Sequence, residues 1–233
     1  MKEHTMFQIT DKAAYLAEID RVIAQGPYQD NWASLTAFQT PAWFSGAKFG
    51  IFIHWGLYSV PAYRNEWYSR SMYVQGTPEY EHHLKTYGPH KDFGYKDFIP
   101  LFTAEKFDPD HWAKTFSQAG ANYVIPVAEH HDGFQMYESC FSAYNAAQMG
   151  PKRDILGELK KACEKRGLLF GASTHRAEHH WFMGCGKDFD SDIREPLSCG
   201  DFYWPSEQTQ PDFQDLFAKP YPSREFLEDW LCR

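Results

Sequence analysis

The sequence contains little of what would mark a membrane protein, a disulfide-bonded protein or a nucleic-acid-binding protein. Its apolar runs are strand-sized, and none approaches the roughly 18 residues that a membrane-spanning helix needs. Five scattered cysteines without a Cys-x-x-Cys pair give neither a disulfide framework nor a zinc ribbon. The formal net charge of -8, without a stripe of Lys and Arg, argues against a phosphate-binding surface. We therefore expect neither a membrane nor a nucleic acid as partner.

The first residues also lack the apolar stretch and cleavage site of a signal peptide, so we expect a cytoplasmic protein. The hydrophobic share of 43% is ordinary for a globular chain of 233 residues, which suffices for one large domain or two small ones. The unusual number is the aromatic share of 18%, much of it outside the predicted strands. Aromatic faces outside a core commonly stack on ligands, and the C–H faces of sugars suit them. Composition alone leaves a protein interface equally open.

Three short apolar runs predict buried strands at residues 49–53, 121–128 and 168–174. One helix is predicted before the second strand, with Asp108 as its N-cap and Gly120 as its stop. Another is predicted between the second and third strands, with Asp154 as its N-cap and Gly167 as its stop. An alternation of strands and helices is typical of a parallel α/β fold. The fold class is therefore α/β.

The remaining segments flank this alternation. An amphipathic helix is predicted at 11–25, followed by an irregular linker, so residues 1–40 form an N-terminal helix and linker. Residues 57–103 make a long excursion whose one predicted helix is near 78–87, and the chain after Trp181 is expected to be loop-like until a helix starts at Ser223. Residues 41–233 form the main domain.

The main domain is expected to be part of a barrel. An eight-stranded (β/α) barrel takes at least about 250 residues, whereas only three strands are counted here because the loops are long. The rival architecture is an open sheet of three strands, which would leave its edges bare. We therefore expect the first three or so strands of a TIM-like (β/α) barrel with long βα loops, truncated after residue 233.

Polar and aromatic side chains follow each predicted strand. They form three groups: His54, Trp55, Glu66 and Trp67; His130, His131 and Asp132; and residues 175–181, from His175 to Trp181. A single histidine at a strand end is more often structural, and an adjacent pair needs a backbone bend, which Gly133 permits. Because the carboxyl ends of parallel strands meet at one edge, these groups together predict a site.

The residue types suit a monosaccharide. A neutral imidazole donates one hydrogen bond and accepts another, a carboxylate accepts two, and an indole offers a flat apolar face. A histidine-based metallohydrolase is the rival, but no His-x-x-x-His or His-Glu-x-x-His spacing occurs, so we expect no metal and no cofactor. For glycoside hydrolysis the candidate carboxylates are Glu66, Glu129, Asp132 and Glu178. Asp132 is expected to order the bend and Glu129 to form a salt bridge, so no nucleophile is selected.

Four motifs in this order resemble the α-L-fucosidases of glycoside hydrolase family 29. They are Lys48-Phe-Gly-Ile-Phe-Ile-His-Trp-Gly56, Asn65-Glu-Trp-Tyr68, Phe107-Asp-Pro-Asp-His-Trp-Ala113 and Glu129-His-His-Asp-Gly-Phe134. The resemblance implies a barrel-like catalytic domain that removes terminal α-L-fucose from a fucosylated oligosaccharide or glycoconjugate by a retaining, metal-free mechanism.

The resemblance also implies roles for individual residues. His54, Glu66, Trp67, His130 and His131 match residues that hold the fucose ring. His175 and Trp181 are placed as further contacts at the third strand end, where many relatives carry a Tyr-Tyr-Ser type segment. The family's nucleophile lies in a Trp-x-Asp context, which is not found after Trp204. We therefore expect no catalytic residue in this chain and no activity from it alone; the alternative is a non-catalytic fucose-binding protein.

Overall fold

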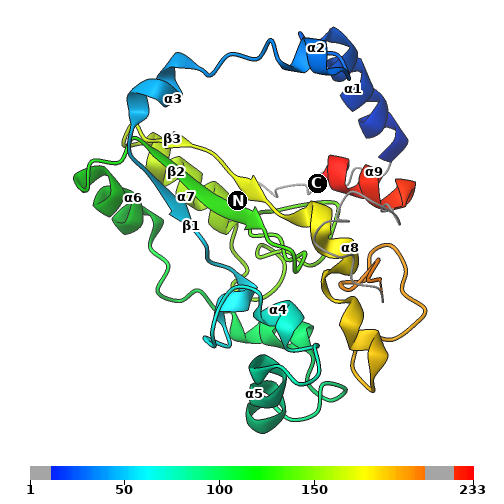
Figure 1. The fold of residues 1–233 in the computed structure, drawn as a ribbon. Helices are drawn as coiled ribbons and strands as arrows, with labels where there is room; N and C mark the ends of the chain where they lie inside the picture. The colour runs from blue at the N-terminus through cyan, green and yellow to red at the C-terminus, as the bar shows by residue number, and fades with distance from the viewer. Residues whose placement is uncertain (1–11, 208–222) are drawn as a thin grey trace, which may run out of the picture.

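A parallel sheet forms the centre of the computed structural model, which describes residues 12–207 and 223–233 (Figure 1). The long middle strand, β2 (Tyr123–Glu129), pairs with β1 (Gly50–Ile53) on one side, where Gly50 lies opposite Tyr123. It also pairs with two short strands, β3 (Leu169–Phe170) and β4 (Ser173–Thr174). All of these pairings are parallel, so the predicted parallel α/β fold is confirmed.

The predicted third strand is wrong in one respect, because residues 168–174 form two strands instead of one. The register of β2 shifts between Val127 and Glu129, and the ladder is interrupted between β3 and β4. A Cβ atom added to Gly171, in the gap, would meet a side-chain carbon of Ile125 at 3.3 Å, so the two chains approach closely there. Whether the sheet continues into a barrel stays a prediction.

Two helices capped as predicted cover the sheet. They are α6 (Pro109–Gln118) and α7 (Ile155–Glu164), which pack against each other, with α7 behind the sheet in Figure 1. The carboxylates of Asp108 and Asp154 accept hydrogen bonds from backbone N–H groups three residues on, both at 2.9 Å. Gly120 and Gly167 then take positive φ angles of 87° and 69°, which end each helix at little cost.

The long excursion contains more helix than predicted. Besides the expected α5 (Pro78–Thr86), capped by the Thr77 hydroxyl, it forms three short helical elements. These are η1 (Leu57–Ser59), α4 (Tyr68–Ser71) and η2 (Tyr95–Leu101). Its aromatic rings are mostly inside, since Tyr68, Tyr95 and Phe98 are completely buried. Much of the aromatic share therefore builds a core beneath the strand ends and is not available for stacking on a ligand.

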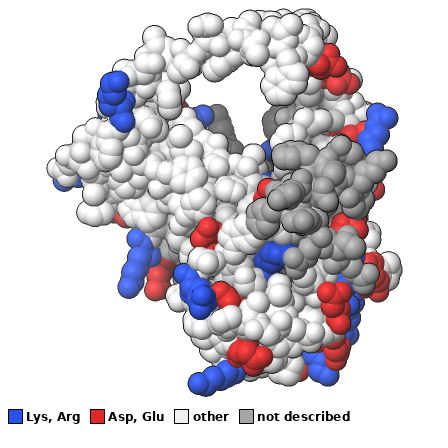
Figure 2. Space-filling model, in the orientation of Figure 1, with Lys and Arg blue, Asp and Glu red and all other residues white. Residues whose placement is uncertain are grey.

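The N-terminal segment lies apart from the sheet. The predicted first helix is α1 (Lys12–Gln25), none of whose side chains is buried; its expected cap, Asp11, is outside the described residues. The segment expected to be irregular contains two short helices, α2 (Trp32–Leu35) and α3 (Ala42–Ala47). In Figure 2 this arm spans an opening before it returns to the body. A separate unit ending at residue 40 stays a prediction.

At the other end, α1 lies against α9 (Arg224–Cys232), which begins at the predicted cap Ser223. After β4 the chain forms η3 (Arg176–Glu178) and α8 (His179–Phe182). The segment after Trp181, which was expected to be loop-like, contains one further helical element, η4 (Gly184–Asp188). Among the residues that the structure describes, no helix is long and apolar enough to cross a membrane. The expected cytoplasmic location stays a prediction.

Candidate functional site

The ends of three strands bring three histidines together. His54 follows β1, His130 follows β2 and His175 follows β4. The ring centroid of His54 lies 5.6 Å from that of His130 and 5.7 Å from that of His175. The centroids of His130 and His175 are 4.7 Å apart. The predicted convergence of the strand ends is therefore confirmed. With His131, these residues are called the imidazole cluster below.

The bend after β2 places two adjacent imidazoles in this cluster. The rings of His130 and His131 lie 4.5 Å apart and almost perpendicular, at 83°. Gly133 supplies the bend with a φ of 80°, and a Cβ atom there would come within 2.8 Å of Arg176 Nη1. Only glycine meets both demands without a shift of its neighbours.

His131 links the cluster to a carboxylate. Its Nε2 atom lies 3.3 Å from His175 Nδ1, and its Nδ1 atom lies 3.0 Å from an oxygen of Glu178 on η3. Ser173 Oγ is 3.4 Å from His175 Nε2 at the other end. A carboxylate, two imidazoles and a hydroxyl thus form one continuous polar series along the edge of the site.

Asp132 orders the bend as predicted. One of its oxygens accepts a hydrogen bond from the backbone N–H of Phe134 at 3.0 Å, and the other accepts one from the Tyr95 hydroxyl at 2.6 Å. Burial raises the pKa of Asp132 to about 7, although both hydrogen bonds act in the opposite direction. Asp132 is therefore held by the fold and does not offer an open carboxylate.

The two predicted tryptophans lie in different layers. The Trp67 ring is partly exposed and lies 5.6 Å from His131 and 6.1 Å from Trp181. Trp181 is only 5% exposed, and the Arg70 guanidinium covers its ring at 4.5 Å. Trp67 can therefore present a face to a ligand, whereas Trp181 supports it from behind. The Trp181 ring therefore has no exposed face that a sugar could contact.

Glu66 faces a cavity of about 280 Å³ next to the cluster. His54, Tyr58 and Asn65 also line it. Tyr58 is a residue that the sequence analysis missed, and its ring lies 4.6 Å from that of His130. No motif could have singled it out, because it lies in the short η1 turn among apolar neighbours. Among the described residues, Glu66 is the one candidate carboxylate that lines this cavity.

Three imidazoles of the cluster, those of His130, His131 and His175, are uncharged near neutral pH. Burial, with help from the neighbouring rings of His131, His175 and His54, lowers the pKa of His130 to about 2. Burial also lowers the pKa of His131 to about 4 and depresses that of His175. Each ring therefore carries one N–H donor and one acceptor nitrogen. The Nδ1 atom of His130 is buried without a hydrogen-bond partner in the described part of the chain.

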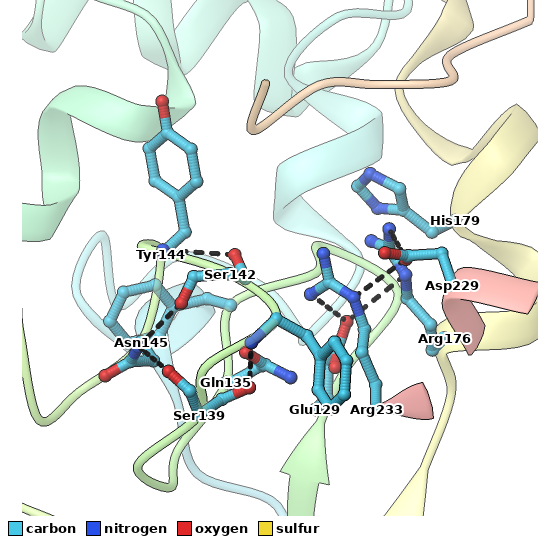
Figure 3. Close-up of polar contacts among 12 residues, drawn as sticks. Glu129, Gln135, Ser139, Ser142, Tyr144, Asn145, Arg176, His179, Asp229 and Arg233 are labelled. Carbon is cyan, nitrogen blue, oxygen red and sulfur yellow. Dashed lines mark hydrogen bonds and ion pairs between the residues drawn. The ribbon is translucent and has the colours of Figure 1, made fainter. Parts of the chain in front are cut away.

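A second polar cluster joins the end of β2 to the C-terminal helix (Figure 3). Glu129 lies 3.4 Å from Arg176 and 3.5 Å from Arg233, while Asp229 lies 3.0 Å and 2.8 Å from the same guanidinium groups. These four residues, the ion-pair cluster below, tie β2 and η3 to α9. All four side chains are nearly buried, and the expectation that Glu129 forms salt bridges is confirmed.

The comparisons with known proteins agree with this arrangement. The family model described as alpha-L-fucosidase matches residues 15–230. The chain is 44% identical to a tissue alpha-L-fucosidase of Homo sapiens over 90% of this chain and 44% of that protein. It is 37% identical to the Bos taurus protein of the same name, over 88% of this chain and 42% of that one. The chain thus spans less than half the length of these curated relatives.

A solved structure is similar as well. The alpha-fucosidase of Thermotoga maritima in complex with fucose superposes with a TM-score of 0.65 at 37% sequence identity. The match covers 85% of this chain and 44% of that one. Most of this chain therefore has a counterpart in a protein of known structure.

Proposed function

Since this chain belongs to the alpha-L-fucosidase family, we propose that its strand ends bind a terminal α-L-fucosyl residue of an oligosaccharide or glycoconjugate for hydrolysis. The observation that carries the proposal is the gathering of imidazoles from three strands beside a cavity that Glu66 lines. The contacts we assign are His54, Glu66, Trp67, His130, His131 and His175.

The chemistry of the pocket matches the two faces of a deoxyhexose. Hydroxyl groups both donate and accept hydrogen bonds, as neutral imidazoles do, and the Glu66 carboxylate can accept from two hydroxyls. The partly exposed ring of Trp67 suits the C–H face and the methyl group of the sugar. The cavity of about 280 Å³ is just below the range of roughly 300–1,000 Å³ typical of ligand pockets. It suits a single sugar residue.

We propose a retaining mechanism in which the chain supplies sugar binding and not the nucleophile or the general acid. A retaining glycosidase places two carboxyl groups about 5–5.5 Å apart on either side of the scissile bond. Of the four candidates here, Glu129 is ion-paired, Asp132 is held by Tyr95, and Glu178 contacts His131. Of these four, Glu66 alone lines the cavity, which supports placing the catalytic pair outside this chain.

The histidines would contribute to catalysis by binding. Hydrogen bonds from the enzyme to sugar hydroxyls strengthen as the ring flattens toward an oxocarbenium-like transition state. Because the imidazoles are already oriented by one another and by Glu178, little reorganisation is needed when the sugar arrives.

The test has two parts. The 233-residue chain is titrated with L-fucose, and the chain and its longer parent are assayed on an aryl α-L-fucoside. We expect saturable fucose binding that His54→Ala weakens at least tenfold, no turnover by the chain, and turnover by the parent. His82→Gln is the control, because His82 on α5 stacks on Tyr63 and is not one of the assigned contacts.

Each other result has a defined meaning. Turnover by the chain would refute the assignment of both catalytic carboxylates to residues outside it. Fucose binding without turnover by either protein would identify a non-catalytic fucose-binding protein. A folded chain that does not bind fucose would refute the proposed site.

A further inference from the structure

The histidines at the three strand ends have a second chemical capacity that sugar binding does not use. Each of His54, His130 and His175 offers one ring nitrogen, and these three atoms lie within 4.8 Å of one another. We propose that this three-histidine set binds a divalent late transition-metal ion, for which Zn²⁺ is the probe, and that the ion and the sugar exclude each other. The exclusion rests on the proposed function, whereas the metal binding does not.

The donor atoms select the class of ion. Imidazole nitrogen suits Zn²⁺, Cu²⁺ and Ni²⁺, whereas Mg²⁺ and Ca²⁺ prefer oxygen ligands. Three protein ligands with one open position is the arrangement of an exchangeable zinc site. Glu66, which lines the same cavity as His54, is a charged group close enough to offset the charge of the ion.

The three ring nitrogens must move slightly closer together to coordinate one ion. In a tetrahedral site with Zn–N distances of 2.0–2.1 Å, ligand nitrogens are about 3.4 Å apart, so the widest pair here must close by about 1.4 Å. His54 is exposed and follows the last residue of β1, so its ring is free to make this movement. His130 is buried and fixed by packing, and it provides the anchor.

An independent observation supports a ligand at this place. His130 is 2% exposed, yet its Nδ1 atom has no hydrogen-bond partner among the described residues. Buried polar atoms are nearly always paired, so an unpaired one is a common mark of a missing ion, water or ligand.

A supporting shell around the set is also in place. Histidine ligands of metals typically make a hydrogen bond through the other ring nitrogen, and such partners change metal affinity by about 10- to 100-fold. His175 makes this contact through Nδ1 to His131, which itself contacts Glu178. The other nitrogen of His175, Nε2, has only the long contact of 3.4 Å with Ser173 Oγ, and it is the nitrogen that can turn toward an ion.

The experiment titrates the chelator-treated 233-residue chain with ZnCl₂ by calorimetry, and records the absorption of the Co²⁺ form. We expect one ion per chain, and at least a tenfold loss of affinity in both His54→Ala and His175→Ala. His82→Gln should bind as tightly as the parent sequence. Circular dichroism confirms that each variant is folded, and His130 is left unchanged because it is buried.

The Co²⁺ spectrum separates this site from the cysteines, since Cys140 and Cys199 are exposed. Imidazole ligation gives no thiolate-to-metal charge-transfer band. Absence of stoichiometric binding, a thiolate band, or equal affinity in both histidine variants and the parent sequence would overturn the proposal.

The exclusion is tested by repeating the zinc titration in saturating L-fucose. We expect the apparent dissociation constant for Zn²⁺ to rise at least tenfold. An unchanged constant, with fucose binding demonstrated separately, would show that the two ligands occupy different places. If fucose does not bind at all while zinc binds as described, the proposed function fails and the metal site stands.

Discussion

The imidazole cluster and the ion-pair cluster are built from neighbouring residues of the same strand ends. Glu129 and His130 are consecutive, as are His175 and Arg176, yet one member of each pair joins the ion pairs and the other joins the imidazoles. Each pair lies where an element ends or begins, since β2 ends at Glu129 and η3 begins at Arg176, so one short stretch supplies two environments.

The two clusters differ in the charge that they carry. In the ion-pair cluster, two carboxylates meet two guanidinium groups, and each charge has an opposite charge within 3.5 Å. In the imidazole cluster, burial lowers the pKa of His130, His131 and His175 and so favours neutral rings. Opposite charges that meet in a buried place hold elements of the fold together, whereas neutral imidazoles beside a cavity can exchange hydrogen bonds with a ligand.

The largest expected effect is the loss of one charge from the ion-pair cluster. Arg176→Met would leave Glu129 and Asp229 facing a single guanidinium group, that of Arg233, in a buried place. Removing one partner of a buried pair typically costs about 3–5 kcal/mol, and we expect a loss of stability in this range from urea denaturation. A loss below about 1 kcal/mol would show that water reaches this cluster. Burial of paired charges would then no longer distinguish the ion-pair cluster from the imidazole cluster.

The next effect concerns function and not stability. If a longer protein that contains this chain has the proposed activity, His54→Ala should reduce its kcat/KM by a factor equivalent to about 2–4 kcal/mol, because hydrogen bonds that strengthen in the transition state are lost. The free energy of unfolding of the chain should change by less than about 0.5 kcal/mol, since His54 is exposed. An unchanged rate with the same substrate would remove His54 from the pocket. The same experiment with His131→Ala tests the buried side of the cluster.

The third effect is a dependence of stability on pH. An unfolded histidine has a pKa of about 6.5, whereas burial lowers the pKa of folded His131 to about 4. Between these values the unfolded chain binds more protons, so the contribution of His131 is full above about pH 6.5 and is lost as the pH falls toward 4. Asp132, whose folded pKa is raised to about 7, acts in the opposite direction and loses its contribution as the pH rises through 7.

The contribution of His131 is isolated by the variant His131→Gln. Its stability should fall less steeply between pH 6.5 and 4 than that of the parent sequence, by on the order of 2 kcal/mol over the window. Asp132 is unchanged in both proteins and cancels. The exposed His111 on α6 provides the control, because His111→Gln should leave the slope as it is. Identical slopes for all three proteins would mean that His131 titrates normally.

The smallest effect is expected from an ion pair at the surface. Lys160 and Glu164 on α7 form a pair at 3.8 Å with both side chains more than half exposed. Lys160→Ala should change the free energy of unfolding by less than about 0.5 kcal/mol. If it matched the loss in Arg176→Met, burial would not be what distinguishes the ion-pair cluster.

The sequence predicts most of the local structure that depends on near neighbours. The caps Thr77, Asp108, Asp154 and Ser223 each act on an N–H group three residues away, so their signal is local. The interruption between β3 and β4 could not be predicted, because it depends on the register against β2. Of the helical elements in the long excursion, α5 was predicted, whereas η1, α4 and η2 were not, because they are short and lie among buried aromatic side chains.

The candidate site was predictable to the level of strand ends. The order of strands indicates which histidines meet, but distances between residues 54, 130 and 175 are set by the sheet. For the same reason no spacing rule could reveal the three-histidine set. Trp181 shows that residue type alone can mislead. An indole ring suits a sugar, yet the Trp181 ring is buried under the Arg70 guanidinium group, which the sequence does not reveal.

The contact between Glu129 and Arg233 has a consequence for the order in which the chain folds. The two residues are 104 positions apart, so the second guanidinium reaches the strand only after α9 has docked. Closing so long a loop is slow relative to forming a helix turn. The contact between Glu129 and Arg233 therefore forms late in folding, after the helix turns and after β2 has paired with its neighbouring strands.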